Sequence, residues 1–188
     1  MYEAVAERYI AGLERRAAEG LAVDRIASVA SFFVSRIDAA VDPLLPDELR
    51  GKTAIANAKL AYQSYLRIFS GTRWENLAEK GARPQRLLWA STSTKNPAYR
   101  DVLYVEELIG SNTVNTLPPA TLEAFREHGK PRASIEEDVA GAQATLAAVE
   151  KHLKLDDVTD RLLVEGVKLF ADAFDKLLAA VETAKKAA

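Results

Sequence analysis

The segment that decides the fold is Leu87-Leu88-Trp89-Ala90-Ser91-Thr92-Ser93-Thr94-Lys95-Asn96-Pro97, in which a short apolar run passes directly into hydroxyl side chains, one lysine and a proline. Apolar runs of this length, bounded by polar residues, are typical of strands that are buried on both faces, as in parallel sheets. Loops at the carboxyl ends of such strands often carry the functional residues of α/β proteins. The sequence therefore predicts a buried strand over 86–90 that ends in a phosphate-binding loop.

Two other apolar segments predict strands on either side of this one, over 26–34 and 113–116. Between and around them, apolar residues recur at helical spacing, and Gly, Pro and capping residues mark where helices begin and end. The helices are expected over 2–19, 38–45, 51–69, 72–78, 101–109 and 118–129. Alternating strands and helices of these lengths indicate a parallel sheet with right-handed crossovers.

The last third of the chain predicts helices only. Ser134 followed by Glu137 is a capping-box pattern, so a long alanine-rich helix is expected from there to about Leu153. Over 156–184 the apolar residues again recur at helical intervals, which predicts one bent helix or two short ones that close the domain. Without an internal repeat or a low-complexity linker, residues 1–188 are expected to form a single domain.

Four strings of the sequence resemble those of transaldolases, in particular the longer actinobacterial and plant-like branch. Besides the segment quoted above, they are ASVASFFVSRID at 27–38, YVEEL at 104–108 and NTLPPATL at 115–122. The strings keep their order and spacing over almost the whole chain. However, they match only the C-terminal half of a transaldolase.

This resemblance explains why only three strands are predicted. An open sheet of three parallel strands would leave two unpaired edges, which are a liability in water. Transaldolases are (β/α)8 TIM barrels, and the three strands look like the sixth, seventh and eighth. The fold class is therefore expected to be α/β, a partial TIM barrel with flanking and C-terminal helices.

The resemblance also implies a transferase reaction of the pentose phosphate pathway, in which a dihydroxyacetone unit passes between sugar phosphates. In the family, a lysine on an earlier strand forms a Schiff base with the substrate. No lysine lies within the three predicted strands. The catalytic lysine and the acid and base carboxylates are therefore expected in the absent N-terminal half, and this chain alone is expected to be inactive.

The residues that remain resemble the phosphate end of the family's site. The resemblance places Ser31 toward the substrate and Arg36, Ser91 and Lys95 around its terminal phosphate. A phosphate monoester is well bound by a bidentate guanidinium, an ammonium and hydroxyl donors, and this set supplies each type. Shorter transaldolases have an arginine near the position where this chain has a longer loop and Lys95 as its nearest cation.

Each of these residues also has a purely structural interpretation. Ser31 is a small residue that packs in a strand, Arg36 pairs with Asp38 or Asp42, Ser91 caps a helix and Lys95 is solvated. A further hypothesis gives the Schiff base to Lys95 itself, although its loop offers little desolvation to lower the lysine pKa.

Composition and charge exclude several other functions. The chain has 48% hydrophobic residues, a net charge of -2 and no cysteine, so neither a broad basic surface for nucleic acid nor a disulfide framework is expected. Charged residues break up the amino-terminal helix, which argues against a signal peptide and for a cytoplasmic protein. Neither a metal-ligand pattern nor a glycine-rich phosphate loop is present, so no cofactor is expected.

The expected partners follow from the half-barrel. They are a sugar-phosphate substrate and either an N-terminal half-barrel chain or a second copy of this chain, with no role for nucleic acid or membrane. The alternative function is a non-catalytic half-barrel that associates with itself or binds phosphate.

Overall fold

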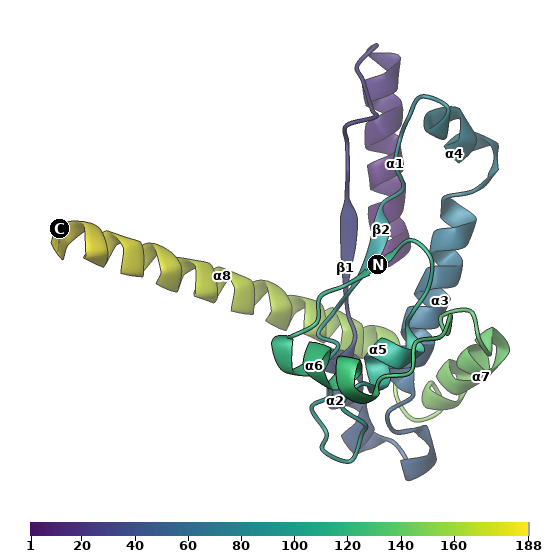
Figure 1. The fold of residues 1–188 in the computed structure, drawn as a ribbon, viewed down its shortest axis with the longest axis vertical. Coiled ribbons are helices and arrows are strands. Elements are labelled where there is room, and N and C mark those ends of the chain that lie inside the picture. The colour runs from purple at the N-terminus through teal and green to yellow at the C-terminus, as the bar shows by residue number, and fades with distance from the viewer. Residues whose placement is uncertain (188) are drawn as a thin grey trace.

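The computed structural model describes residues 1–187, and in it three parallel strands form one sheet in the order β1, β2, β3 (Figure 1). The strands are β1 (Val29–Phe33), β2 (Arg86–Ala90) and β3 (Thr113–Asn115). The α-helices are α1 (Tyr2–Ala18), α2 (Ser35–Val41), α3 (Thr53–Ile68), α4 (Gly71–Ala78), α5 (Leu103–Glu107), α6 (Pro119–His128), α7 (Val139–Val149) and α8 (Leu155–Ala187). Two short 3-10 helices, η1 (Asp42–Leu44) and η2 (Asp47–Leu49), follow α2. The parallel α/β sheet is the coarse fold that the sequence predicted, and it is consistent with a partial TIM barrel.

The two faces of the sheet have different environments. On one face Phe32 of β1 lies in register with Trp89 of β2, their rings meet edge to face, and both pack into the main hydrophobic core. The core also contains side chains from α2, α3, α5, α7 and the start of α8. On the other face Ser31 lies in register with Leu88, and Val29 at the start of β1 is 41% exposed. One face of the sheet is therefore covered by helices, and the other is largely open.

Trp89 is the largest side chain at the centre of the main core. It is 1% exposed, and its indole Nε1 donates to the backbone oxygen of Leu108 at 3.0 Å. A second, smaller core lies between α1 and α4 and is formed by Ile10, Leu13, Val23, Trp74, Leu77 and Ala82. Trp74 and Trp89 are thus packing residues.

Several predicted boundaries are wrong in an informative way. The first strand begins at Val29, three residues later than expected, and α2 begins at Ser35, three residues earlier. Arg36 consequently lies in the first turn of a helix and not in a loop.

The predicted capping box at Ser134 is also wrong, because Ser134 is fully buried and its hydroxyl donates to the backbone oxygen of Glu106. Helix α7 begins only at Val139, where Asp138 caps it by accepting from the Gly141 amide at 3.0 Å.

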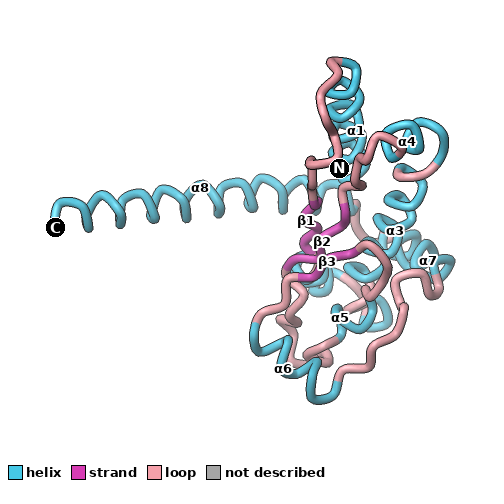
Figure 2. The backbone as a smooth tube through the Cα atoms, turned by 45° about the horizontal axis from the view of Figure 1, so that its top comes forward, coloured by secondary structure: helices cyan, strands magenta, loops and turns pink. Residues whose placement is uncertain are grey.

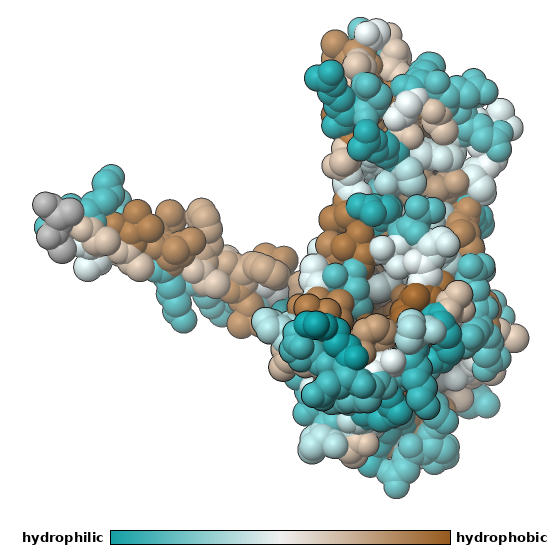
Figure 3. All heavy atoms as spheres, viewed as in Figure 1, coloured by the Kyte–Doolittle hydropathy of each residue, from teal (hydrophilic) through white to brown (hydrophobic). Residues whose placement is uncertain are grey.

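The prediction that the last helices close the domain is wrong. Residues 155–187 form one 33-residue helix, α8, which extends away from the sheet (Figure 1 and Figure 2). Only its beginning packs against the main core, through Leu155, Val158 and Leu162. Figure 3 shows apolar residues exposed along the extended part. The exposed apolar side chains of α8 are Leu163, Val164, Val167, Leu169, Phe170, Phe174, Leu177, Leu178 and Val181.

Candidate functional site

The carboxyl ends of β1 and β2 are joined by a short ladder that continues past the strands. The amide of Val34 donates to Ala90 at 2.9 Å, and the amide of Ser35 donates to the backbone oxygen of Ser91 at 3.0 Å. The hydroxyls of Ser35 and Ser91 are also 2.8 Å apart and share a hydrogen bond. Ser91 has a φ of 56°, a left-handed conformation that is unusual outside glycine. The chain therefore turns sharply at Ser91 and places two hydroxyls between the two strand ends.

Arg36 lies next to this junction, in the first turn of α2. It is partly buried, and its guanidinium carbon is 4.3 Å from the centre of the Phe33 ring, within cation–π distance. The same ring meets Phe170 of α8 with centroids 6.3 Å apart. The Arg36 guanidinium thus packs on the Phe33 ring, which in turn contacts Phe170. The alternative pairing with Asp38 or Asp42 is not what the structure shows, because those carboxylates bind other groups.

Lys95 and Ser31 are more exposed than the other two predicted residues. The Lys95 ammonium donates to the hydroxyl of Ser93 at 2.8 Å and is otherwise in contact with solvent. Ser31 lies on the open face of β1. Within residues 1–187 no hydrogen bond joins two of the four predicted residues. The structure joins Ser91 to Ser35, the neighbour of Arg36 in the sequence, and it places Lys95 further along the loop that begins at Ser91.

Two buried carboxylates beneath the junction are important residues that the sequence reasoning did not single out for function. Asp38 on α2 is 1% exposed and accepts from the phenol of Tyr104 at 2.8 Å. Asp42 on η1 is 8% exposed and accepts from the phenol of Tyr99 at 2.6 Å. We call these four residues the tyrosine–carboxylate cluster. Nothing in the sequence alone indicates that the aspartates of one segment face the tyrosines of another.

Each carboxylate of the cluster also binds a backbone amide of the segment that begins α3. Asp38 accepts from Ala54 at 2.7 Å, and Asp42 accepts from Gly51 at 3.0 Å. Burial raises the pKa of Asp38 to about 6, against the two hydrogen bonds, which favour the ionised form. Burial and the bond to Asp42 raise the pKa of Tyr99 to about 12. The phenols therefore stay protonated and donate to the carboxylates at neutral pH.

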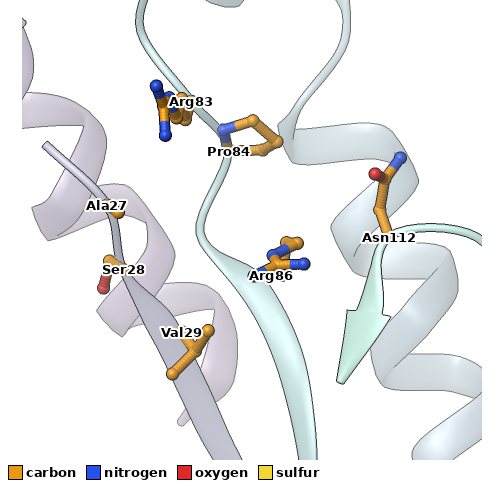
Figure 4. A pocket seen from close by; sticks show the side chains of 7 residues that line it. All are labelled: Ala27, Ser28, Val29, Arg83, Pro84, Arg86 and Asn112. Carbon is orange, nitrogen blue, oxygen red and sulfur yellow. The ribbon is translucent and has the colours of Figure 1, made fainter. Parts of the chain in front are cut away.

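A groove of about 500 Å³ lies at the opposite ends of the strands, where β1 and β2 begin. It is lined by Ala27, Ser28, Val29, Arg83, Pro84, Arg86 and Asn112 (Figure 4). Its two arginines come from the start of β2 and the segment before it. None of the four predicted site residues lines this groove, so the predicted site and the groove occupy opposite ends of the sheet.

Within residues 1–187, no group of three or more histidine, cysteine, aspartate or glutamate side chains is arranged to hold a metal ion. Among the helices of the same residues, none combines the length and the apolar character needed to cross a membrane.

Comparison with known proteins gives one consistent result. The family model described as transaldolase/fructose-6-phosphate aldolase matches residues 2–181. The chain is 47% identical over 192 residues to a transaldolase of Trichodesmium erythraeum, covering 93% of this chain and 50% of that protein. It is 51% identical over 186 residues to a transaldolase of Parafrankia sp., covering 94% and 50%. A transaldolase of Thiobacillus denitrificans is 49% identical over 187 residues, with coverage of 95% and 52%. The chain spans about half the length of the curated relatives it matches.

Proposed function

Because this chain belongs to the transaldolase/fructose-6-phosphate aldolase family, we propose that it is the phosphate-binding half of a transaldolase. In this proposal residues 1–188 form one domain, and β1, β2 and β3 are the sixth, seventh and eighth strands of a (β/α)8 barrel. The observation that carries the proposal is the junction at the carboxyl ends of β1 and β2, which joins the Arg36 segment to the Ser91 segment.

The chemistry of this junction suits the terminal phosphate of a sugar phosphate. The Arg36 guanidinium supplies paired N–H donors, and stacking on Phe33 limits its motion. The Ser91 hydroxyl turns from Ser35 to the ligand, while Lys95 adds an exposed positive charge. Ser31 lies on the open face of β1 and would reach the sugar from inside the barrel.

The covalent step belongs to residues outside these 188. A Schiff-base lysine must lose its proton near neutral pH, which requires burial or a neighbouring cation. Lys95 is exposed and bonded to a hydroxyl, so its surroundings do not meet this requirement. We therefore assign Lys95 to phosphate binding. The chain holds the substrate while a lysine of the remaining barrel strands, on the same polypeptide or another, attacks its ketone carbonyl.

The surface that would receive the rest of the barrel is the open face of the sheet together with α8. Nine large apolar side chains of α8 are between 44% and 69% exposed. The free face and the two unpaired edges of the sheet offer further contact area and backbone hydrogen bonds. A complementary half-barrel is the partner that we propose for this surface.

Reconstitution tests this function. The purified chain is mixed with the N-terminal half of the Thiobacillus denitrificans transaldolase, and dihydroxyacetone transfer from fructose 6-phosphate is measured. Borohydride is then added, and intact mass identifies the chain that carries the trapped imine. We expect activity only in the mixture, with the adduct on the N-terminal half. An adduct on this chain that disappears in Lys95→Arg would transfer the Schiff base to Lys95 and overturn the assignment.

A second candidate function is a half-barrel that associates with itself and does not catalyse. The exposed face of α8 favours it, because a second copy carries the same apolar surface. Light scattering of the chain, alone and with the N-terminal half, separates the two functions. We expect that any dimer of the chain dissociates when the N-terminal half is added. A dimer that persists beside a folded N-terminal half would favour self-association.

A further inference from the structure

The tyrosine–carboxylate cluster connects the two segments that carry the cations of the proposed site. Asp38 lies on α2 shortly after Arg36, and Asp42 follows on η1. Tyr99 lies in the loop shortly after Lys95, and Tyr104 lies on α5 beyond it. Each hydrogen bond of the cluster therefore ties the Arg36 side of the junction to the Lys95 side.

The loop between Ser91 and Tyr99 has few other anchors on the Lys95 side. Neither helix nor strand is present over residues 91–99, and Lys95, Asn96, Pro97 and Ala98 are exposed. The other hydrogen bonds of this part are local, such as Lys95 to Ser93 and the amide of Ala98 to Asn96. Tyr99 is thus the first residue after Lys95 that fastens the loop to another element.

The packing of Tyr99 shows that its position is closely defined. Gly51 has a φ of 71°, and a Cβ added there would lie 2.9 Å from the Tyr99 ring. The amide of the same glycine donates to Asp42, the acceptor of the Tyr99 phenol. The ring therefore occupies the space that a side chain at position 51 would need, and its hydroxyl is held by Asp42.

From this arrangement we propose that the tyrosine–carboxylate cluster positions the 91–99 loop, so that Lys95 and Ser91 face the same phosphate as Arg36. The four residues are positioning residues and do not touch the ligand. The proposal rests on the proposed function for the identity of the ligand, but the order of the loop is a property of the chain itself. Loss of one phenol releases the loop, and the ammonium of Lys95 is then spread over more positions, which weakens phosphate binding.

The first test compares Tyr99→Phe with Tyr9→Phe. Both changes remove one hydroxyl from a partly exposed tyrosine, and the Tyr9 phenol donates to the backbone oxygen of Arg83, near the other ends of the strands. Amide hydrogen exchange of residues 91–99 is measured by mass spectrometry, and the Kd for fructose 6-phosphate by phosphorus NMR. We expect Tyr99→Phe to speed exchange of this loop and to raise Kd by about fivefold to tenfold, which corresponds to the net free energy of one typical hydrogen bond. Tyr9→Phe should leave both unchanged.

A second pair tests the buried half of the cluster. Tyr104→Phe removes the bond to Asp38, and Tyr62→Phe removes an equally buried phenol that donates to the backbone oxygen of Ser111 at 3.0 Å. Both variants lose stability, and the position of the melting transition reports this loss. Only Tyr104→Phe should raise the Kd for fructose 6-phosphate under conditions where both variants are folded.

The outcomes separate this inference from the proposed function. Absence of fructose 6-phosphate binding by the wild-type chain would count against the proposed function, while exchange in the 91–99 loop would still decide the role of the cluster. Loop exchange and Kd in Tyr99→Phe that both match those of the wild type would overturn the inference.

Discussion

Two regions of the chain differ in whether their side chains have partners. They are the junction at the carboxyl ends of β1 and β2 and the extended part of α8. At the junction two carboxylates are almost fully buried, and each accepts one phenol and one backbone amide. Along α8 large apolar side chains from Leu163 to Val181 remain exposed. Buried polar groups persist only when they are paired, whereas exposed apolar surface of this extent marks a contact that is not yet made. The polar groups of the first region are paired within this chain, and the second region is the surface that we propose for a partner.

Removal of the central core side chain should have the largest effect on stability. Trp89→Ala leaves a cavity where the ring met Phe32 and loses the indole bond to Leu108. We expect the free energy of unfolding to fall by about 3–5 kcal/mol, measured by urea denaturation. A loss below about 1 kcal/mol would show that the core under the sheet is not the stable part of the chain.

A pH-dependent effect of intermediate size is expected at Asp38. Its pKa is 3.8 in a model peptide and about 6 in the folded chain, so the folded state binds the proton more tightly. This contribution to stability is complete below pH 4 and is lost as the pH rises through about 6, a difference of roughly 3 kcal/mol. The groups that face the carboxylate are Asp42, Tyr104, Tyr99 and the Ala54 amide, and Asp42 adds to the upward shift in pKa.

Asp38→Asn separates the contribution of Asp38 to the pH dependence of stability from that of the other carboxylates. The amide has nearly the same shape and no titration, so the decrease in stability between pH 4 and pH 7 should be smaller in the variant than in the wild type. Urea denaturation of both proteins across this range gives the difference. Parallel curves would mean that Asp38 has the same pKa in the folded and unfolded states and that burial does not raise it.

The smallest effect is expected on α8. Phe174 is 59% exposed, so Phe174→Asp should change the free energy of unfolding of the chain by less than about 0.5 kcal/mol. The same substitution places a charge on the surface proposed for the complementary half-barrel, and it should weaken binding of that half by at least tenfold. Asp175→Asn, a change on a neighbouring position of the helix, is the control. A cooperative loss of stability in Phe174→Asp would instead show that α8 is already covered.

The difference between the two regions also explains which parts of the fold could be read from the sequence. The strand over 86–90 was predicted with its observed bounds, because a continuous apolar run between polar residues has few other stable conformations. Periodicity also identified most helices. For α8 it showed an apolar face but not what covers that face, and the expectation that this helix closes the domain was therefore wrong.

At the candidate site, too, the sequence did not show which distant residues are in contact. The resemblance supplied Arg36 and Ser91, and the structure joins their segments through Ser35. The contacts of Asp42 with Tyr99 could not be inferred, because the residues are 57 positions apart and neither lies in an obvious motif. Ser134 illustrates the converse: a local capping pattern was overruled by a tertiary hydrogen bond to Glu106.

The most direct test of the phosphate site is a titration of the chain with fructose 6-phosphate, followed by phosphorus NMR, for the wild type, Lys95→Ala, Arg36→Ala and Lys80→Ala. Lys80 is an exposed lysine between α4 and the start of β2, the end of that strand opposite the junction, and serves as the charge-matched control. We expect saturable binding in the wild type and in Lys80→Ala, with at least tenfold weaker binding in Lys95→Ala and in Arg36→Ala. Equal binding in all four proteins would place the phosphate elsewhere and contradict the proposed phosphate site.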